Sequence, residues 1–553
     1  MFVVRTFLAN TNLKYVKFTH FKKAEAIWLW WFLVLLLILF LQLMTLDVLP
    51  HIQQDEVQIT DYGRLALNPL SEWSVTWLVE EGKPLFLWSY VGPLIAELSF
   101  QIGGTSGLGP RIASLTGGIF AASMVFGWLI SRKVPVYAAF GLGIAFLLDP
   151  LFVLSQRMGR VDAWVMGFCL ASCWILRLAK DRKRYQEIWL LTGAGALAAV
   201  AAFIWPSAIF LYPLVILELV GVANKSDITN KTKYLRKKII FFGLGGFITG
   251  ILLLLPIRNH ILTIFSDMGS MVSRNVDASK SIEDQLLALF EYQHWVKLSK
   301  VYIKTLSPIF PILALMAIII KREKGLILGM VVSMAIIFAS LVYEFRALYL
   351  LPYFSALIGG LFIQNSTAHG KIWEKHFSKL FLGFLVLWSI SISLVTRTVM
   401  GFESKTELDR NKIYNFASSS VGEGEHKVFL NYTYELYFAG RSLGWKIYTP
   451  YIQFSMDQEG NWIRSTSYEE DPAFTELLRQ MDFAIFSEGS VNNILQQQLT
   501  SAGLHLFFTP NLIEEERSRP LLENNRNKEI VLFFLRGKDT YGSYVLYGRK
   551  KSL

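Results

Sequence analysis

The chain has 553 residues, 53% of them hydrophobic, and a mean hydropathy of +0.39. A water-soluble chain of this length would divide into several domains with polar surfaces. Here apolar runs of about 17–22 residues recur instead, each long enough to cross roughly 30 Å of hydrocarbon. The formal charge of +11 comes from short Lys and Arg clusters between these runs, as in cytoplasmic loops of membrane proteins. We therefore expect an integral membrane protein without a nucleic acid partner.

The apolar runs follow one another through the first 400 residues. They lie at about 27–46, 85–103, 111–131, 136–153, 164–178, 188–204, 207–222, 239–256, 304–320, 326–342, 350–363 and 380–399. The first run has a basic segment before it and no small-residue cleavage site, so we interpret it as a retained span rather than a signal peptide. The second run is unusual because it contains Pro93 and Glu97.

The basic segments decide whether 85–103 crosses the membrane. If it does not cross, one set of basic segments shares the cytoplasmic side and holds 24 Lys and Arg against 5 Asp and Glu. These segments are 1–26, 132–133, 177–184, 224–238, 321–324 and 371–379. If it does cross, all but the first face outside, against the positive-inside rule. We therefore expect 85–103 to be re-entrant or interfacial, which leaves eleven transmembrane helices.

This topology leaves an acidic first loop and a C-terminal region outside the cytoplasm. Loop 47–84 carries seven Asp and Glu and a predicted interfacial helix near 71–81. After about residue 400, short strand-like runs at 427–432, 482–487, 529–535 and 543–548 alternate with helical patterns around 468–480 and 489–502. We expect three parts: a basic cytoplasmic N-terminus (1–26), a transmembrane domain (27–400) and an extracytoplasmic α/β domain (401–553). The last domain has no catalytic motif, and we expect it to bind the acceptor or to act as a scaffold.

Three outer loops place acidic and basic groups beside membrane entry points. They contribute Asp55 and Glu56; Arg157, Arg160 and Asp162; and Arg346 and Tyr349. A carboxylate can accept the proton of an incoming hydroxyl, and cations can neutralise a departing phosphate, where losing one donor costs roughly 3 kcal/mol. Each motif alone has a structural explanation, since an Asp-Glu pair in a loop is usually solvated and Arg160 with Asp162 could be an interfacial anchor. Lys83 could likewise extend to lipid head groups.

The order and placement of these residues resemble the GT-C glycosyltransferases, especially bacterial relatives of the protein O-mannosyltransferases and of the lipid A aminoarabinose transferase. The resemblance covers the first 400 residues. Its matching elements are Asp55-Glu56, Lys83-Pro84-Leu85 with Trp88, Arg111, Arg157 with Asp162, and Tyr349 to Pro352. Two positions depart from the pattern. Leu85 replaces the usual second proline, and Leu348 stands where a basic residue is expected, with Arg346 two positions earlier.

The resemblance implies inverting transfer of a sugar from a polyprenyl-phosphate donor to a glycan, lipid or protein acceptor, with Asp55 as the base. It further implies a bacterial inner membrane, with the catalytic loops outside the cytoplasm. Glu56 and Asp162 are the other candidate catalytic residues. The candidates for binding the donor phosphate are Lys83, Arg157, Arg160, Arg346 and Tyr349. We expect no cofactor: a divalent metal held by His51, Asp55, Asp162 and His294 is the alternative, but nothing in their spacing indicates it.

Three other functions stay open. A lipid-linked sugar transporter or flippase would show inverted repeats and acids near the middle of the membrane, whereas the sequence has no evident repeat and its acids cluster at the outer edge. A ligase or polymerase would use a larger, pyrophosphate-linked glycan. A membrane anchor without catalytic activity would leave the outer-loop residues unexplained.

Overall fold

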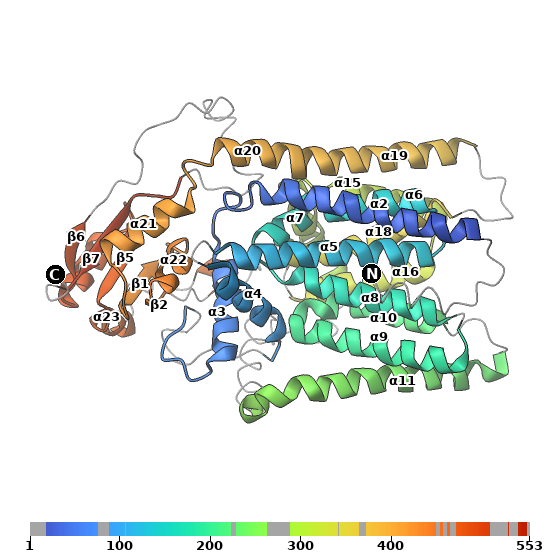
Figure 1. Ribbon diagram of the computed structural model, residues 1–553, viewed down its shortest axis with the longest axis horizontal. Coiled ribbons are helices and arrows are strands. Elements are labelled where there is room, and N and C mark those ends of the chain that lie inside the picture. The colour runs from blue at the N-terminus through green and yellow to red at the C-terminus, as the bar shows by residue number, and fades with distance from the viewer. Residues whose placement is uncertain are drawn as a thin grey trace.

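Apolar helices lie side by side over most of the chain, and a small sheet follows at one end of them (Figure 1). The computed structural model describes residues 18–75, 88–104, 107–180, 182–222, 228–262, 288–340, 342–363, 372–449, 454–456, 462–464, 472–508, 529 and 540–549. The helices up to residue 403 are α2 (Phe18–Leu43), α3 (Gln54–Leu67), α4 (Val91–Gly103), α5 (Leu108–Ser131), α6 (Val136–Leu147), α7 (Pro150–Arg157), α8 (Asp162–Ala179), α9 (Arg184–Ile204), η2 (Pro206–Phe210), α10 (Tyr212–Val222), α11 (Ile228–Leu254), η4 (Leu255–His260), η5 (Ala288–Phe290), α14 (Tyr292–Lys304), α15 (Ile309–Lys321), α16 (Lys324–Ser340), α17 (Glu344–Ala347), η6 (Leu348–Leu350), α18 (Leu351–Gly360), α19 (Ile372–Ile390), the π-helical η7 (Ser391–Thr396) and α20 (Arg397–Glu403).

Each of the eleven apolar runs expected to span overlaps one of these helices, but the count of eleven spans is not confirmed. Among the described residues, six helices are long and apolar enough to cross a membrane. The pair α6 and α7, bent by 51°, is a seventh if it forms one span. Helices α10, α15, α16 and α18 have 11, 13, 17 and 10 residues, fewer than the roughly 20 that a span needs.

The bend between α6 and α7 follows from its sequence. Pro150 lacks a backbone N–H and is favoured in the first turn of a helix, so it starts a new helix more readily than it continues one. The side chain of Asp149 caps that helix by accepting hydrogen bonds from the N–H groups of Leu151 and Phe152 at 3.0 and 3.3 Å. The α7 helix therefore leaves the direction of α6 shortly before the second outer loop.

Helix α4, within the predicted re-entrant or interfacial run, has 13 residues and is about 20 Å long, which is too short to span. It packs against α3 so closely that a Cβ on Gly63 would lie 2.1 Å from the carbonyl oxygen of Pro93. Of the interfacial helix predicted near 71–81, residues 71–75 are not helical and 76–81 lie outside the described residues. Helices α3 and α4 together cover one end of the bundle (Figure 1).

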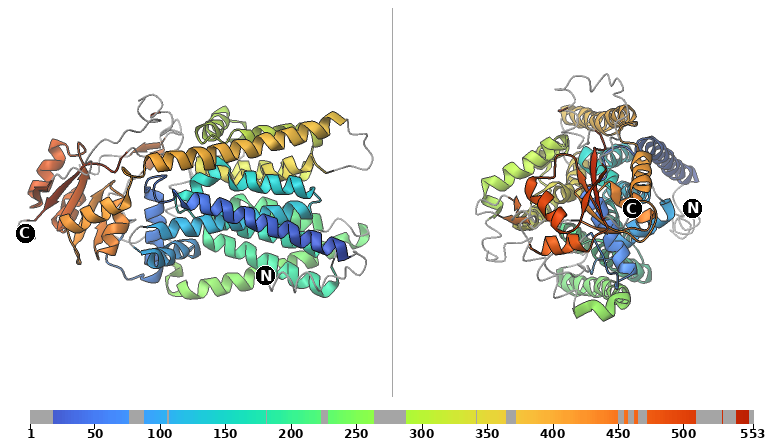
Figure 2. Two further views of the ribbon diagram at one scale, coloured as in Figure 1. Left: turned by 45° about the horizontal axis from the view of Figure 1, so that its top comes forward. Right: turned by 90° about the vertical axis from the view of Figure 1, so that its left-hand side faces the viewer.

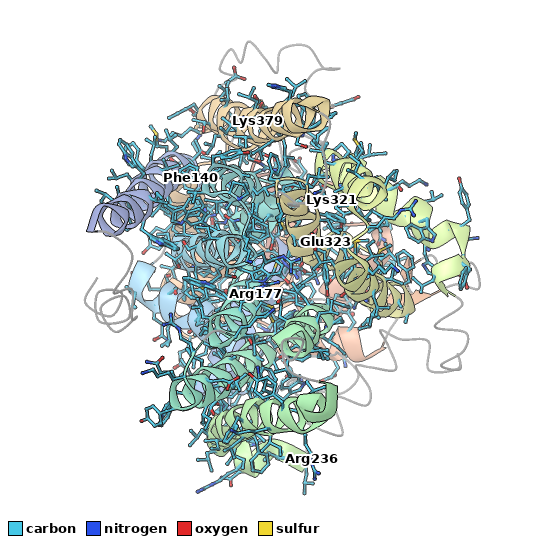
Figure 3. All side chains as sticks on the ribbon, turned by 90° about the vertical axis from the view of Figure 1, so that its right-hand side faces the viewer. Phe140, Arg177, Arg236, Lys321, Glu323 and Lys379 are labelled. Atoms are coloured by element: carbon cyan, nitrogen blue, oxygen red, sulfur yellow. The ribbon has the colours of Figure 1, made fainter. Side chains whose placement is uncertain are left out.

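The basic segments gather at the other end. Figure 3 looks onto that end and shows Arg177, Arg236, Lys321 and Lys379, from four of the segments predicted to be cytoplasmic. Two of the acids among them are paired, since Arg132 bridges Glu218 at 2.8 Å and Glu323 at 2.7 Å, and Arg177 also reaches Glu218. The excess of positive charge predicted from sequence is thus a property of one end of the bundle.

The C-terminal region forms an α/β unit beyond α3 and α4 (Figure 2). Its main sheet has the order β2-β1-β5-β7-β6, in which β2, β1 and β5 are parallel and β7 is antiparallel to both of its neighbours, β5 and β6. Three strands and both helices predicted from the sequence are present, whereas residues 530–535 of the predicted strand 529–535 lie outside the described residues. The elements are α21 (Arg410–Ser420), β1 (Lys427–Asn431), α22 (Leu436–Ser442), β2 (Lys446–Tyr448), β3 (Phe454–Met456), β4 (Trp462–Arg464), α23 (Pro472–Arg479), β5 (Phe483–Ser487), α24 (Asn493–Ser501), β6 (His505–Phe508) and β7 (Tyr544–Gly548).

Buried polar contacts fasten this unit to α3 and α4. Arg441 of α22 donates two hydrogen bonds, of 2.6 and 2.8 Å, to the buried carboxylate of Glu97 in α4. The hydroxyl of Tyr437 donates to buried Asp61 in α3 at 3.0 Å. Since α3 also carries Asp55, the C-terminal unit and the candidate active site share one helix.

Candidate active site

The three outer loops singled out from the sequence meet at the end of the bundle that α3 covers. Asp55 lies in the first turn of α3, and Asp162 is the first residue of α8. Acidic side chains are favoured at helix N-termini, where the backbone N–H groups lack partners. The third loop contributes the short helix α17 and the 3₁₀ turn η6, which precede α18.

Arg160 joins two of these loops. Its Nη1 donates to the carboxylate of Asp55, and its Nε donates to Asp162 at 2.7 Å. Its guanidinium carbon lies 3.7 Å from the ring centroid of Phe345 in the third loop, a distance that favours a cation–π contact. Burial alone would lower the pKa of Arg160, but Asp162 and Asp55 outweigh it and raise that pKa above its ordinary value. The guanidinium is therefore a fixed positive charge.

Asp162 is buried and saturated with donors. Besides the bond from Arg160, its carboxylate accepts from the hydroxyl of Tyr349 at 2.8 Å and from that of Ser155 at 3.3 Å. Its side chain is 1% exposed. A carboxylate held in this way can orient Arg160, but it has little room to take a proton from a substrate.

Asp55 differs from Asp162 in being reachable. Its side chain is 38% exposed, whereas that of Arg160 is 5% exposed. A general base must come within hydrogen-bond reach of the proton that it removes. Of the two carboxylates in this network, Asp55 alone meets that requirement.

Arg346 supplies a second cation beside Arg160. Burial lowers the pKa of Arg346, while its hydrogen bond with Tyr343 acts in the opposite direction, and Arg160 is close enough to influence it. Its guanidinium carbon lies 5.2 Å from the ring centroid of Tyr343. Buried Arg160 and half-buried Arg346 therefore lie beside the reachable carboxylate of Asp55. This arrangement suits a negatively charged group next to a reacting hydroxyl.

The structure thus brings together five of the eight predicted site residues: Asp55, Arg160, Asp162, Arg346 and Tyr349. Two more, Glu56 and Arg157, lie beside this cluster with other partners. Lys83 lies outside the described residues. Among the residues that are described, no three His, Cys, Asp or Glu side chains gather as metal ligands would.

Two solved structures match the fold of this chain over nearly the full length of both chains. ArnT from Cupriavidus metallidurans bound to undecaprenyl phosphate is 11% identical, with a TM-score of 0.55 over 94% of this chain and 98% of that chain. The apo state of the same protein is 12% identical, with a TM-score of 0.51 over 96% and 99%. The chain therefore shares the overall fold of ArnT. No protein-family model and no curated protein matches the sequence.

Within this fold, Glu56 supports the first outer loop. Both of its oxygens accept from Arg111, each at 2.8 Å, and both side chains are fully buried. Arg111 also donates to the carbonyl oxygens of Leu46 and Pro50, each at 2.8 Å. Glu56 is therefore buried and engaged by Arg111, although it directly follows Asp55. We reassign it from catalysis to the support of this loop.

Arg157 also has a structural role, like Glu56. It is buried and donates to the carbonyl oxygens of Gln42, Thr45 and Leu49 and to the hydroxyl of Thr45. These contacts close the turn that links α2 to α3. They do not bring Arg157 into the network around Arg160, so we no longer assign it to the donor phosphate there.

Removing the charge of Glu56 should destabilise the protein strongly. We expect Glu56→Gln to cost about 3–5 kcal/mol, because Arg111 would remain buried without its counter-ion. The measurement is the unfolding midpoint of the purified protein in detergent. The double variant Glu56→Met/Arg111→Met, which buries no charge, should recover most of the loss. A single variant as stable as the wild type would show that Glu56 does not support this loop.

Sequence reasoning missed the neutral residues of the site. Ser155 donates to Asp162, Ser207 hydrogen-bonds Tyr349, and Phe345 carries the cation–π contact. Ser155 and Ser207 are single serines within or beside apolar runs, and nothing in their sequence neighbourhood distinguishes them from helix-packing residues. Phe345 directly precedes Arg346 in the third loop, but an aromatic residue at a membrane boundary is ordinary.

Proposed function

We propose that this chain transfers a sugar, with inversion, from a polyprenyl-phosphate donor to an acceptor hydroxyl. The observation that carries the proposal is the reachable carboxylate of Asp55 joined to the buried guanidinium of Arg160, with Arg346 beside them. The GT-C fold supports it, and a solved structure with the same fold, ArnT, binds undecaprenyl phosphate.

In the proposed reaction, Asp55 accepts the proton of the acceptor hydroxyl while that oxygen attacks the anomeric carbon. The bond from this carbon to the phosphate oxygen breaks, and its electron pair leaves with the phosphate. Arg160 and Arg346 balance the charge that grows on the leaving group. As Asp55 takes up the proton, its hold on Arg160 weakens, so Nη1 of Arg160 becomes available to the departing phosphate.

The proposed orientation follows from the two ends of the bundle. The end with Arg177, Arg236, Lys321 and Lys379 would face the cytoplasm, as the positive-inside rule requires. The candidate active site and the α/β unit from residue 401 would then lie outside, on the outer face of a bacterial inner membrane. Residues 27–400 would be the transmembrane domain that binds the lipid tail of the donor.

A transfer assay with defined donors tests this function. The purified protein is supplied with radiolabelled hexose, pentose or aminosugar linked to polyprenyl phosphate, together with glycan, lipid and protein acceptors. We expect label to move to one acceptor class with equal release of polyprenyl phosphate. Movement of intact labelled lipid across a proteoliposome membrane would identify a flippase instead. Use of pyrophosphate-linked donors alone would identify a ligase or polymerase.

A further inference from the structure

Arg397 is a buried arginine to which the described residues give no partner. It is 2% exposed and begins α20, directly after the π-helical turn η7. Its Nε and Nη1 are buried and make no hydrogen bond, and no described carboxylate pairs with it. Arginine keeps its charge in proteins, and an uncompensated buried charge costs several kcal/mol. A bound anion would compensate this buried positive charge.

Arg157 adds a second buried positive charge near Arg397. Arg157 lies close enough to Arg397 for the two charges to repel each other. The hydrogen bonds of Arg157 go to carbonyl oxygens and to the hydroxyl of Thr45, all uncharged groups. Asp47 also influences Arg157, but it forms no ion pair with it among the described residues. Neither of the two guanidinium charges is matched by a bonded carboxylate of the described chain.

The position of Arg397 places it between peripheral helices. Gly401, one helical turn further on, lies so close to the segment after α2 that an added Cβ would be 2.5 Å from Cβ of Thr45. The face of α20 that carries Arg397 and Gly401 therefore points toward the end of α2, and η7 contacts both α2 and α7. The opposite face of α20 carries exposed Val399 and Phe402, and Val395 of η7 is exposed as well, so a single helix separates Arg397 from the surface of the bundle.

Two further buried polar atoms without described partners belong to the neighbouring segments η7 and α2. The hydroxyl of Ser393, one turn before Arg397, and the amide oxygen of Gln42 in α2 are buried and have no hydrogen-bond partner within the described chain. A hydroxyl can donate to an anion, and an amide can do so by turning its NH₂ group. The π-helical turn also fits a binding role, since such turns are frequent at functional sites.

We propose that Arg397 and Arg157, with Ser393 and Gln42, bind a phosphate group, and that the head group of an anionic membrane lipid supplies it. Glu403, the last residue of α20, lies six positions after Arg397, about 9 Å along a helix, which is a suitable depth for a lipid head group. Arginine is well matched to phosphate because its planar donors can bind two oxygens at once. The site is distinct from the network of Arg160, Asp55 and Asp162.

Thermal unfolding with defined anions tests this site. The full-length protein in a neutral detergent is titrated with phosphatidylglycerol, phosphatidylcholine or inorganic phosphate. We expect phosphatidylglycerol to raise the unfolding temperature of the wild type by about 2–4 °C and phosphatidylcholine to leave it unchanged. Arg397→Met should lose this rise, Arg397→Lys should keep part of it, and Arg258→Met, at an exposed arginine after α11, should keep all of it.

The same experiment separates binding from packing. Without anion, Arg397→Met should be at least as stable as the wild type, because it removes an uncompensated charge. If Arg397→Met unfolds at a lower temperature by the same amount with and without phosphatidylglycerol, Arg397 only packs and the proposal is overturned. Equal responses to phosphatidylglycerol and phosphatidylcholine, or no response to any anion, overturn it as well. A rise with inorganic phosphate alone supports the phosphate site and refutes the lipid as its source.

Discussion

Replacing Asp55 with Asn should slow sugar transfer about 10²- to 10⁴-fold, the usual contribution of a general base, and leave donor binding nearly unchanged. Asparagine keeps the size of the side chain and can still accept a hydrogen bond from Arg160, but it cannot take a proton. Because the Asp55 side chain is 38% exposed, the substitution should alter stability little. Single-turnover transfer and equilibrium binding of a labelled donor measure the two effects separately.

Glu72→Gln is the matched control, since Glu72 lies in the same outer loop with its side chain 83% exposed. It should transfer sugar at the rate of the wild type. Equal rates for Asp55→Asn and the wild type would remove Asp55 from catalysis. A parallel loss of donor binding and transfer in Asp55→Asn would point to a binding role.

The grouping of the site was predictable because topology alone places its loops together. Once the basic segments are assigned to one side, the loops of Asp55, Asp162 and Arg346 must emerge on the other. Loops at one end of a helix bundle can converge even when they are far apart in sequence. The structure confirms that they do, since Arg160 reaches Asp55, Asp162 and the ring of Phe345.

The distinction between neighbouring residues was not predictable. Asp55 and Glu56 are adjacent, but successive residues of a helix point about 100° apart, so one reaches solvent and the other reaches Arg111. Arg157 ends α7, whereas Arg160 follows the turn after it. In the sequence, the two members of each pair, Asp55 with Glu56 and Arg157 with Arg160, have the same charge and lie in the same loop. Their partners come from segments about 55 and 110 positions distant.

The span count stays unconfirmed and the edges of the sheet escaped prediction, both for reasons of length. An apolar run such as 207–222 shows that a segment is buried, but the helix within it, α10, has 11 residues because η2 takes up the first part of the run. The central strands β1 and β5 were visible as continuous apolar runs, typical of strands buried on both faces. Strand β2 has three residues and β6 four, which is too short for a reliable pattern.

Arg160→Gln should lower both stability and turnover, and a second substitution should separate the two. The single variant leaves Asp162 buried without its cation, which costs about 3–5 kcal/mol. It also removes a donor aimed at the departing phosphate, which should slow transfer about 10²- to 10³-fold. Unfolding midpoints and single-turnover rates of the same preparations provide the comparison.

The double variant Arg160→Gln/Asp162→Asn decides which loss belongs to catalysis. It buries no net charge, and its two amides can still hydrogen-bond each other, Tyr349 and Ser155, so stability should return to within about 1–2 kcal/mol of the wild type. Transfer should stay slow, because no cation remains at position 160 to meet the phosphate. If the rate recovers together with the stability, Arg160 serves only to hold Asp162 in place. Arg346 would then have to carry the charge of the leaving group alone.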